Sequence, residues 1–216
     1  ASTKLVIENE VDQDVFRYSP HTTYGRSKVI GEISVRESPI FKISCIIRPT
    51  SHWGPYSIAD HIPYARFFKY VFRGLYFHPE QMNQNKYFGF VQNTCHQIEA
   101  LINAKPETVN QGLFYLADYE SLKILEWANL IRKTAGKSRV RVIPKVTVRF
   151  LAILGDLLKA CGMNEPPLTT FRIKNMSKET TGVPLEAIKS ILAHCPVGLS
   201  KGTEITIDYL LKEDAL

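Results

Sequence analysis

Tyr24 and Lys28 have the residue types and the spacing for proton transfer. They lie in the stretch Thr23-Tyr-Gly-Arg-Ser-Lys-Val-Ile-Gly-Glu32, which we expect to form a helix. Residues at i and i+4 share one face of a helix, so both polar heads can reach the same substrate. An ammonium group next to a tyrosine stabilises the phenolate form. The pair therefore predicts chemistry that interconverts an alcohol and a ketone.

The spacing alone is weak evidence, because Tyr119 and Lys123 repeat it in a stretch that we interpret as an exposed helix start. Glycine, serine and a Gly31-Glu32 step surround only the first pair. The wider string Tyr-Gly-x-Ser-Lys-x-x-Gly-Glu resembles the active-site helix of extended short-chain dehydrogenases/reductases. Within them it is most similar to the NAD-dependent epimerases and dehydratases of nucleotide sugars.

The resemblance implies three catalytic residues and a nicotinamide cofactor. Ala1-Ser-Thr-Lys-Leu-Val6 is similar to the strand end that carries the family's hydroxyl residue, which places Thr3 at that position, with Ser2 as the fallback. Tyr24 would transfer the proton and contact the cofactor, and Lys28 would also hold the nicotinamide ribose. Thr3 would orient the reacting oxygen. The expected cofactor is NAD, with NADP as the alternative.

The segment Arg48-Pro-Thr-Ser-His-Trp-Gly-Pro55 resembles the family's Arg-Pro-x-Asn-x-Tyr-Gly-Pro. The resemblance places Pro49, Thr50 and Ser51 beside the cofactor, and Ser51 also beside the sugar. A serine reaches less far than the usual asparagine, so His52 is an alternative substrate contact. His52 could equally be a histidine that fills a polar niche in a loop.

Two later segments carry candidate contacts to substrate phosphate. Lys86-Tyr-Phe-Gly-Phe-Val-Gln-Asn93 resembles the family's Arg-x-x-x-x-Val-x-Asp. Lys86 keeps the positive charge of that arginine without its bidentate geometry. We expect Asn93, in place of aspartate, to affect a helix start. Arg172 is a further candidate, in a segment that would line the substrate region.

Strand-like and helix-like segments alternate along the chain, which predicts an α/β fold with a parallel sheet. We expect strands at 1–7, 43–47, 87–91, 113–117 and 139–143, and an ordered loop at 48–55. We expect helices at 22–37, 64–72, 93–104, 121–134, 145–161, 184–193 and 200–211.

The family resemblance implies part of a doubly wound, Rossmann-like sheet with a smaller, mostly helical substrate lobe. By that resemblance, residues 1–50 and 92–135 belong to the NAD domain. Residues 51–91 and 136–216 then form the substrate-binding lobe.

Composition excludes several other classes of protein. The 216 residues are 44% hydrophobic, which is enough for a core, and the four cysteines form no Cys-x-x-Cys pair. This favours the reducing cytoplasm and argues against a metal site. The net charge of +6 is densest at 137–145, which we interpret as a strand with a solvated face, with attraction for anionic substrates or a membrane surface as the alternative. We therefore expect no nucleic-acid partner.

The most apolar stretch, 146–163, contains Arg149, Asp156 and Lys159. Charges at the depth of a bilayer are costly, so we do not expect a membrane span. We expect an amphipathic helix packed on the core, and a weak interfacial membrane contact stays open.

The sequence lacks the glycine-rich turn on which dinucleotide binding depends in this fold. We therefore expect the C-terminal portion of a longer enzyme, inactive by itself and homodimeric when intact, or a truncated relative. Two alternatives to a nucleotide-sugar enzyme remain. One is a dehydrogenase of steroid- or flavonoid-like alcohols, and the other is a non-catalytic binding or scaffold protein.

The missing turn gives a direct prediction. Calorimetric titration of the 216-residue polypeptide with NAD should show no tight binding, because no backbone cradle holds the pyrophosphate. Tight binding by this polypeptide alone would contradict the expectation of a longer enzyme.

Overall fold

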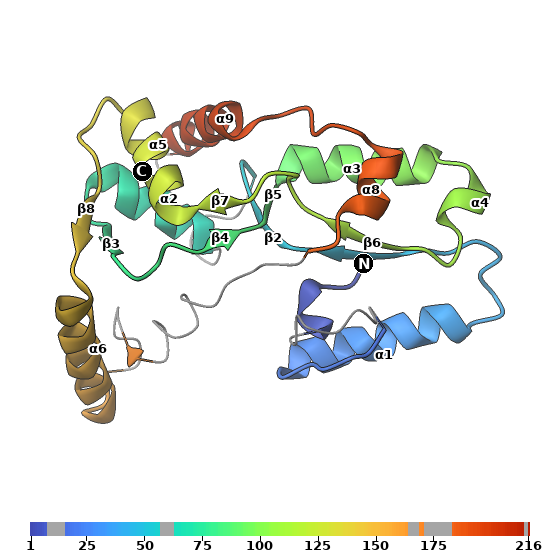
Figure 1. The fold of residues 1–216 in the computed structure, drawn as a ribbon, viewed down its shortest axis with the longest axis horizontal. Helices are drawn as coiled ribbons and strands as arrows, with labels where there is room; N and C mark the ends of the chain where they lie inside the picture. Colours follow the sequence, from blue (N-terminus) through green and yellow to red (C-terminus); the bar gives the residue numbers. More distant parts are fainter. Residues whose placement is uncertain (8–15, 57–62, 164–168, 171–182, 214–215) are drawn as a thin grey trace. The chain divides into compact units, whose positions relative to one another are not determined.

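The computed structural model describes residues 1–7, 16–56, 63–163, 169–170, 183–213 and 216 (Figure 1). The chain divides into two compact units. Unit 1 comprises Ala1–Pro55, Tyr87–Ser121 and Thr181–Gly202. Unit 2 comprises Tyr56–Lys86, Leu122–Thr180 and Thr203–Leu216.

Unit 1 is built around a parallel strand pair. β1 (Ile46–Pro49) pairs with β6 (Leu113–Leu116), with Ile46 opposite Leu113. A 3-10 helix, η1 (Lys4–Val6), precedes α1 (Thr23–Glu37). Figure 1 shows α1 on one side of this strand pair and α3 and α8 on the other. The unit therefore has helices on both faces of a parallel pair, as in doubly wound folds.

A second parallel pair in unit 1 joins β2 (Ser51–Trp53) to β5 (Phe88–Phe90). The helices are α3 (Val91–Asn103), α4 (Pro106–Val109) and α8 (Glu186–Ile191). A buried cluster joins β6 to these helices through residues such as Leu101, Leu116 and Ile188. Because these side chains come from three separate segments, the core fixes their arrangement.

Unit 2 contains β3 (Phe77–Pro79), parallel to β8 (Arg141–Ile143), and β4 (Asn85–Lys86), antiparallel to β7 (Leu122–Lys123). Its helices are α2 (Pro63–Arg73), α5 (Ile124–Thr134) and α6 (Lys145–Ala160). α9 (Leu199–Lys212) begins in the last residues of unit 1 and continues into unit 2. Gly74 follows α2 with φ of 79°, a left-handed conformation that lets the chain turn after a helix.

Aromatic side chains form the core of unit 2. The rings of Phe67 and Phe68 in α2 lie 5.1 and 5.5 Å, centroid to centroid, from that of Trp127 in α5. Trp127 and Phe68 are at most 1% exposed. The aromatic stripe of this helix is therefore a packing surface within unit 2.

The structure confirms the α/β class and the expected helix at 22–37, which Thr22 caps by accepting a hydrogen bond from the Gly25 N–H at 2.9 Å. Three other expectations are wrong. Residues 4–6 form a 3-10 helix instead of a strand. The expected loop at 48–55 contains the end of β1 and all of β2. Lys123 belongs to β7, not to an exposed helix start.

The stretch at 146–163 packs on the core as expected, but through one narrow side of the helix. In α6 only Val148, Ala152 and Gly155 are buried. No helix among the described residues is long and apolar enough to cross a membrane. Within the same described part of the chain, no group of histidine, cysteine, aspartate or glutamate side chains is placed to hold a metal ion.

Two glycines of α1 provide a matched test of this packing. A Cβ on Gly25 would lie 2.8 Å from the carbonyl oxygen of Leu5, whereas one on Gly31 would meet nothing within 4 Å. Gly31→Ala should therefore raise the free energy of unfolding by about 0.5–1 kcal/mol through helix propensity. Gly25→Ala should lower it by about 1–3 kcal/mol, because α1 must move away from η1. Urea denaturation measures both, and equal effects would contradict the close contact.

Candidate active site

Tyr24 and Lys28 lie side by side near the start of α1. The Tyr24 side chain is 53% exposed, and the Lys28 Nζ lies 5.4 Å from the centroid of its ring. An ammonium at this distance interacts favourably with the face of an aromatic ring. The phenol is thus accessible to a substrate while the lysine stays beside it.

Thr3 lies on the segment against which the start of α1 packs. Its Oγ1 accepts a hydrogen bond from the Leu5 N–H at 3.4 Å and caps η1. The Leu5 carbonyl in turn lies against Gly25, the residue that follows Tyr24. The neighbouring Ser2 is buried, and its N–H donates to the Ile47 carbonyl of β1 at 2.8 Å. The chain start therefore connects the Tyr24 helix to β1.

A buried ion pair connects α1 to β1 directly. Arg48 donates from Nε to Oε1 of Glu32 at 2.8 Å and from Nη2 to Oε2 at 2.6 Å. Both side chains are almost completely buried. Two parallel hydrogen bonds of this kind fix orientation as well as distance. The pair therefore sets the position of the helix that carries Tyr24 relative to the strand.

Two tyrosines make further hydrogen bonds to this pair. The Tyr18 hydroxyl donates to Glu32 Oε2 at 2.9 Å, and Arg48 Nη1 donates to the Tyr115 hydroxyl at 2.8 Å. Burial opposes ionisation of Glu32, but the hydrogen bonds from Arg48 and Tyr18 and the Arg48 charge outweigh it, so the pKa of Glu32 is lowered. The carboxylate therefore stays ionised at neutral pH.

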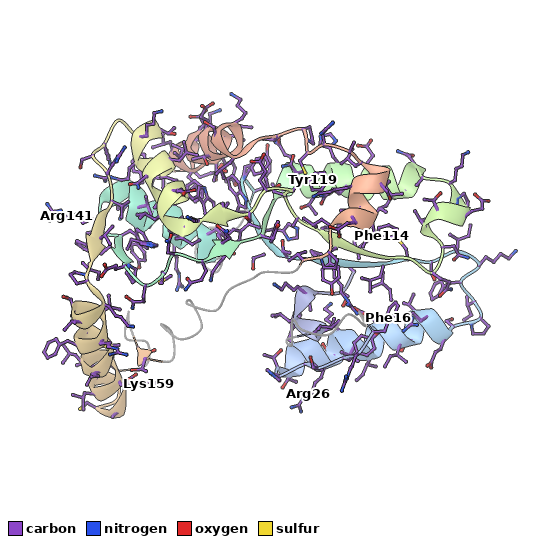
Figure 2. All side chains as sticks on the ribbon, viewed as in Figure 1. Phe16, Arg26, Phe114, Tyr119, Arg141 and Lys159 are labelled. Carbon is purple, nitrogen blue, oxygen red and sulfur yellow. The ribbon has the colours of Figure 1, made fainter. Side chains whose placement is uncertain are left out.

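The outer side of α1 carries a further contact. The guanidinium of Arg36 lies 3.7 Å from the centroid of the Phe16 ring, and Figure 2 labels Phe16 beside this helix. Arginine stacks favourably on aromatic faces. α1 is thus held from the segment before it as well as from β1.

The candidate cofactor contacts follow the ion pair along the chain. Pro49 ends β1 opposite Leu116, and both the N–H and the hydroxyl of Thr50 donate to the Leu116 carbonyl, at 3.0 and 3.2 Å. Ser51 is exposed and opens β2. Thr50 is therefore fixed by two hydrogen bonds, while Ser51 offers its side chain to solvent or ligand.

His52 occupies a polar niche inside unit 1. A Cβ on Gly89 would lie 3.2 Å from the His52 Nε2 and 3.0 Å from the Thr94 hydroxyl oxygen, so the glycine makes room for both. These two atoms are buried and have no hydrogen-bond partner among the described residues. Burial lowers the pKa of His52, so its ring is neutral at pH 7. Its substrate contact stays a prediction.

Asn93 lies in the first turn of α3, the helix start that it was expected to affect, and its side chain links this turn to two other segments. It is 1% exposed, and its side-chain amide donates to the Asp118 carboxylate at 2.7 Å and to the Val197 carbonyl at 2.8 Å. The Val197 N–H donates back to Asn93 Oδ1 at 2.9 Å. The amide therefore joins α3 to the loop after β6 and to the segment before α9.

The second Tyr-x-x-x-Lys pair has a different environment. The Tyr119 hydroxyl donates to the Leu192 carbonyl at 2.5 Å. Burial is the main reason that the pKa of Tyr119 is raised. Tyr119 is thus a structural residue, and the resemblance in spacing carries no chemistry there.

Two sequence-predicted candidates remain. Lys86 belongs to β4 in unit 2. Arg172 lies outside the described residues.

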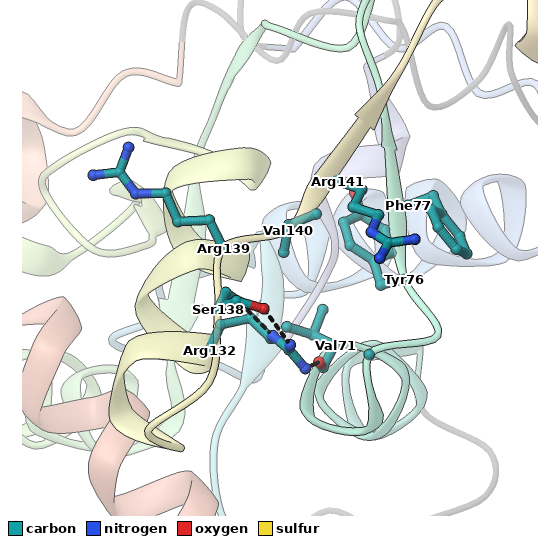
Figure 3. Close-up of a pocket in the computed structure, with 9 residues that line it drawn as sticks. Val71, Tyr76, Phe77, Arg132, Ser138, Arg139, Val140 and Arg141 are labelled. Atoms are coloured by element: carbon teal, nitrogen blue, oxygen red, sulfur yellow. Dashed lines mark hydrogen bonds between the residues drawn. The ribbon is translucent and has the colours of Figure 1, made fainter.

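Unit 2 also contains a pocket of about 210 Å³ between α2, α5 and the strands β3 and β8 (Figure 3). In it Arg132 Nε donates to the Ser138 carbonyl at 2.7 Å, and Figure 3 shows its guanidinium between Ser138 and Val71. Arg132 is therefore a packing residue. Figure 3 shows the guanidinium of Arg139 pointing away from the other labelled side chains.

Sequence reasoning missed the positioning role of Glu32, Arg48, Tyr18 and Tyr115. Glu32 ends the motif that contains Tyr24, and Arg48 begins the segment that ends at Pro55. An acidic residue in one motif and a basic residue in the other were the available signal. Tyr18 and Tyr115 gave no signal, because a tyrosine beside an apolar run is typical of many strands and loops.

No family model matches the chain, and no curated protein matches it. Solved structures do share its fold. UDP-glucuronic acid 4-epimerase from Bacillus cereus, in complex with NAD, is 18% identical with a TM-score of 0.65, over 98% of this chain and 60% of that one.

ADP-L-glycero-D-manno-heptose-6-epimerase from Helicobacter pylori is 14% identical with a TM-score of 0.65, over 97% of this chain and 58% of that one. dTDP-glucose 4,6-dehydratase from Bacillus anthracis is 11% identical with a TM-score of 0.59, over 99% of this chain and 61% of that one. The chain therefore has the fold of the corresponding part of these Rossmann-like enzymes, and it spans about 60% of their length.

Removal of the Glu32 charge should be costly. Glu32→Gln leaves the Arg48 guanidinium buried without an anionic partner, which should lower the free energy of unfolding by about 3–5 kcal/mol at pH 7. Glu37→Gln, at the exposed end of the same helix, is the control and should change it by at most about 0.5 kcal/mol. Denaturant titrations measure both, and equal losses would contradict the role of the ion pair.

The same pair predicts a pH dependence. Because the folded-state pKa of Glu32 lies below its ordinary value of 4.5, its contribution to stability is present above that pH. The contribution is lost as the pH falls from 4.5 through the lower folded-state pKa. Stability curves of the Glu32→Gln variant should lack this part of the acid loss, whereas those of Glu37→Gln should keep it.

Proposed function

We propose that the chain forms the proton-transfer and sugar-binding part of an NAD(P)-dependent epimerase or dehydratase that acts on a nucleotide-linked sugar. One observation carries the proposal. The exposed Tyr24 phenol and the Lys28 ammonium lie together on a helix that a buried ion pair ties to β1, directly before Pro49–Ser51. The shared fold with enzymes of this kind supports it.

Each residue has a role that fits its observed contacts. Tyr24 takes the proton of a sugar hydroxyl, and Lys28 lies beside it as the neighbouring positive charge. Thr3 Oγ1 already accepts from Leu5, so its own O–H is left to donate to the sugar oxygen. Bound NAD would supply the acceptor for the hydride that leaves the same carbon.

The proposal assigns Lys28, Pro49, Thr50 and Ser51 to the cofactor side. Structural neighbours contain NAD, or NADPH in an enzyme from Pseudomonas aeruginosa, which supports this class of cofactor. A glycine-rich pyrophosphate turn does not occur in these 216 residues. We therefore assign the pyrophosphate to a part of a longer enzyme that this sequence does not contain.

The substrate assignment rests on polar residues. Ser51 and His52 would contact the sugar, and Lys86 and Arg172 the phosphates. The Bacillus cereus epimerase has also been crystallised with UDP-glucuronic acid, which supports this class of ligand. A hydrophobic alcohol would need exposed apolar lining, but Phe68 and Trp127 are buried against each other. That observation favours the nucleotide sugar over the hydrophobic alcohol.

The four cysteines are all free, which agrees with a cytoplasmic enzyme. We also propose that the intact enzyme is a homodimer.

Substitution of Tyr24 tests the catalytic assignment. In an active form of the enzyme that contains this chain, Tyr24→Phe should lower kcat by about 10²–10⁴, with nucleotide-sugar affinity largely retained, because only the proton acceptor is lost. Tyr70→Phe is the matched control, since Tyr70 is 50% exposed and Tyr24 53%. Steady-state kinetics with a panel of nucleotide sugars and hydrophobic alcohols measures both.

Near-normal turnover of the Tyr24→Phe variant would remove this residue as the base. Faster turnover of hydrophobic alcohols than of nucleotide sugars by the unsubstituted enzyme would reject the substrate class while leaving the proton transfer intact.

A further inference from the structure

α6 exposes an unusually large apolar surface. Apolar side chains are normally buried where they are this dense, yet seven in this helix are exposed. Their exposed fractions are 78% for Val146, 69% for Phe150, 40% for Leu151, 58% for Ile153, 44% for Leu154, 58% for Leu157 and 38% for Leu158. Figure 2 shows side chains projecting along this helix, on which Lys159 is labelled.

These side chains form one continuous face. At about 100° per residue, the arc from Ile153 through Val146, Phe150 and Leu157 to Leu151 covers about 160° of the helix. No charged residue falls within this arc. The buried residues Val148, Ala152 and Gly155 occupy the other side. The helix is therefore attached to its unit by a narrow stripe and exposes a wider apolar one.

Basic side chains border this face. Lys145 and Arg149 are exposed and lie on the flank between the buried stripe and the apolar arc, with Asp156 between them, and the exposed Lys159 lies near the C-terminal end of the helix. The one acidic residue of the helix, Asp156, accepts a hydrogen bond from the Thr170 N–H at 3.3 Å. The helix therefore presents an apolar surface with a positive margin.

The strand before the helix extends the positive margin. β8 ends two residues before α6 begins, and the side chains of Arg139 and Arg141 are exposed in and next to it. Both belong to the dense basic run at 137–145, for which the proposed catalytic function has no use. The run and the apolar arc thus adjoin each other along the chain.

We propose that α6 lies in the interfacial layer of a bilayer that contains anionic lipid. An apolar face with basic residues at its edge is the pattern of helices that rest in the plane of a membrane, with lipid phosphates at the basic margin. The face does not suit a second copy of this chain, because association through it would bring the same positive charges together. A spanning role is excluded for this helix by its length and charges.

The proposal is independent of the proposed catalytic function and is tested by vesicle binding. The full chain is sedimented with phosphatidylcholine vesicles, with and without phosphatidylserine. We expect binding that increases with phosphatidylserine. The double variant Phe150→Glu/Leu157→Glu should bind at least about tenfold more weakly, because both charges fall at the centre of the apolar arc.

A matched control separates insertion from simple charge repulsion. Ile40→Glu/Ile102→Glu adds the same two charges at apolar residues that are 82% and 76% exposed outside α6. It should retain most of the binding. Equal losses in the two double variants would overturn the proposal.

A spectroscopic readout guards against a variant that fails to fold. Phe150→Trp is a conservative change at an exposed position, and the two native tryptophans are at most 2% exposed. Its emission should shift to shorter wavelength on addition of phosphatidylserine vesicles, while that of Ile102→Trp should not. Absence of a shift would reject insertion. Concentration-dependent self-association that Phe150→Glu/Leu157→Glu abolishes, without vesicle binding, would assign the face to a protein contact instead.

Discussion

The Arg48–Glu32 ion pair ties together the two segments that matter most for the proposed chemistry. Glu32 lies two turns beyond Tyr24 on the same helix, and Arg48 immediately precedes Pro49. The transfer of two charges from water to a protein interior costs free energy unless the two groups pair with good geometry. Here the two hydrogen bonds of the pair, with Tyr18 and Tyr115 beside them, meet that condition. Exposed residues are thereby positioned by charges that contact no substrate.

The same principle operates a second time in unit 1. Asn93 is buried and Asp118 is partly buried, and Asp118 also accepts from the Phe90 N–H at 3.0 Å. Burial raises the pKa of Asp118, and the hydrogen bonds from Asn93 and Phe90 lower it again in part. The two networks flank β1 and β6 from different helices, so the parallel pair is held by polar contacts as well as by its apolar core.

Sequence reasoning worked best where local and tertiary preferences agree. Thr22 caps α1 as its residue type suggests, and the apolar run at 113–117 forms a strand in the core. It failed where a short segment satisfies two patterns. Lys4–Val6 is apolar enough for a strand, but the Thr3 hydroxyl favours a tight 3-10 turn. Pro49 suggested a loop, yet a proline fits the end of a strand, where no further N–H is needed.

The site was predictable in part for a similar reason. The spacing of Tyr24 and Lys28 is local, so a helix is enough to bring them together. The contacts of Arg48 with Glu32 and Tyr115 depend on how separate segments pack, which periodicity does not report. The exposed face of α6 could not be predicted from the sequence, because an amphipathic pattern does not show which side of the helix packs on the core.

The tie between Asn93 and Val197 has a consequence for how unit 1 assembles. The partners of the Arg48–Glu32 pair are 16 residues apart, whereas Asn93 and Val197 are 104 apart. On a growing chain the first contact can form once residue 48 has been synthesised, whereas the amide of Asn93 meets its acceptor only after residue 197 has been synthesised. Until then the side-chain amide of Asn93, which is buried in the folded unit, lacks the Val197 carbonyl as its acceptor. The hydrogen bonds between Asn93 and Val197 therefore form only when the segment around residue 197 has joined unit 1.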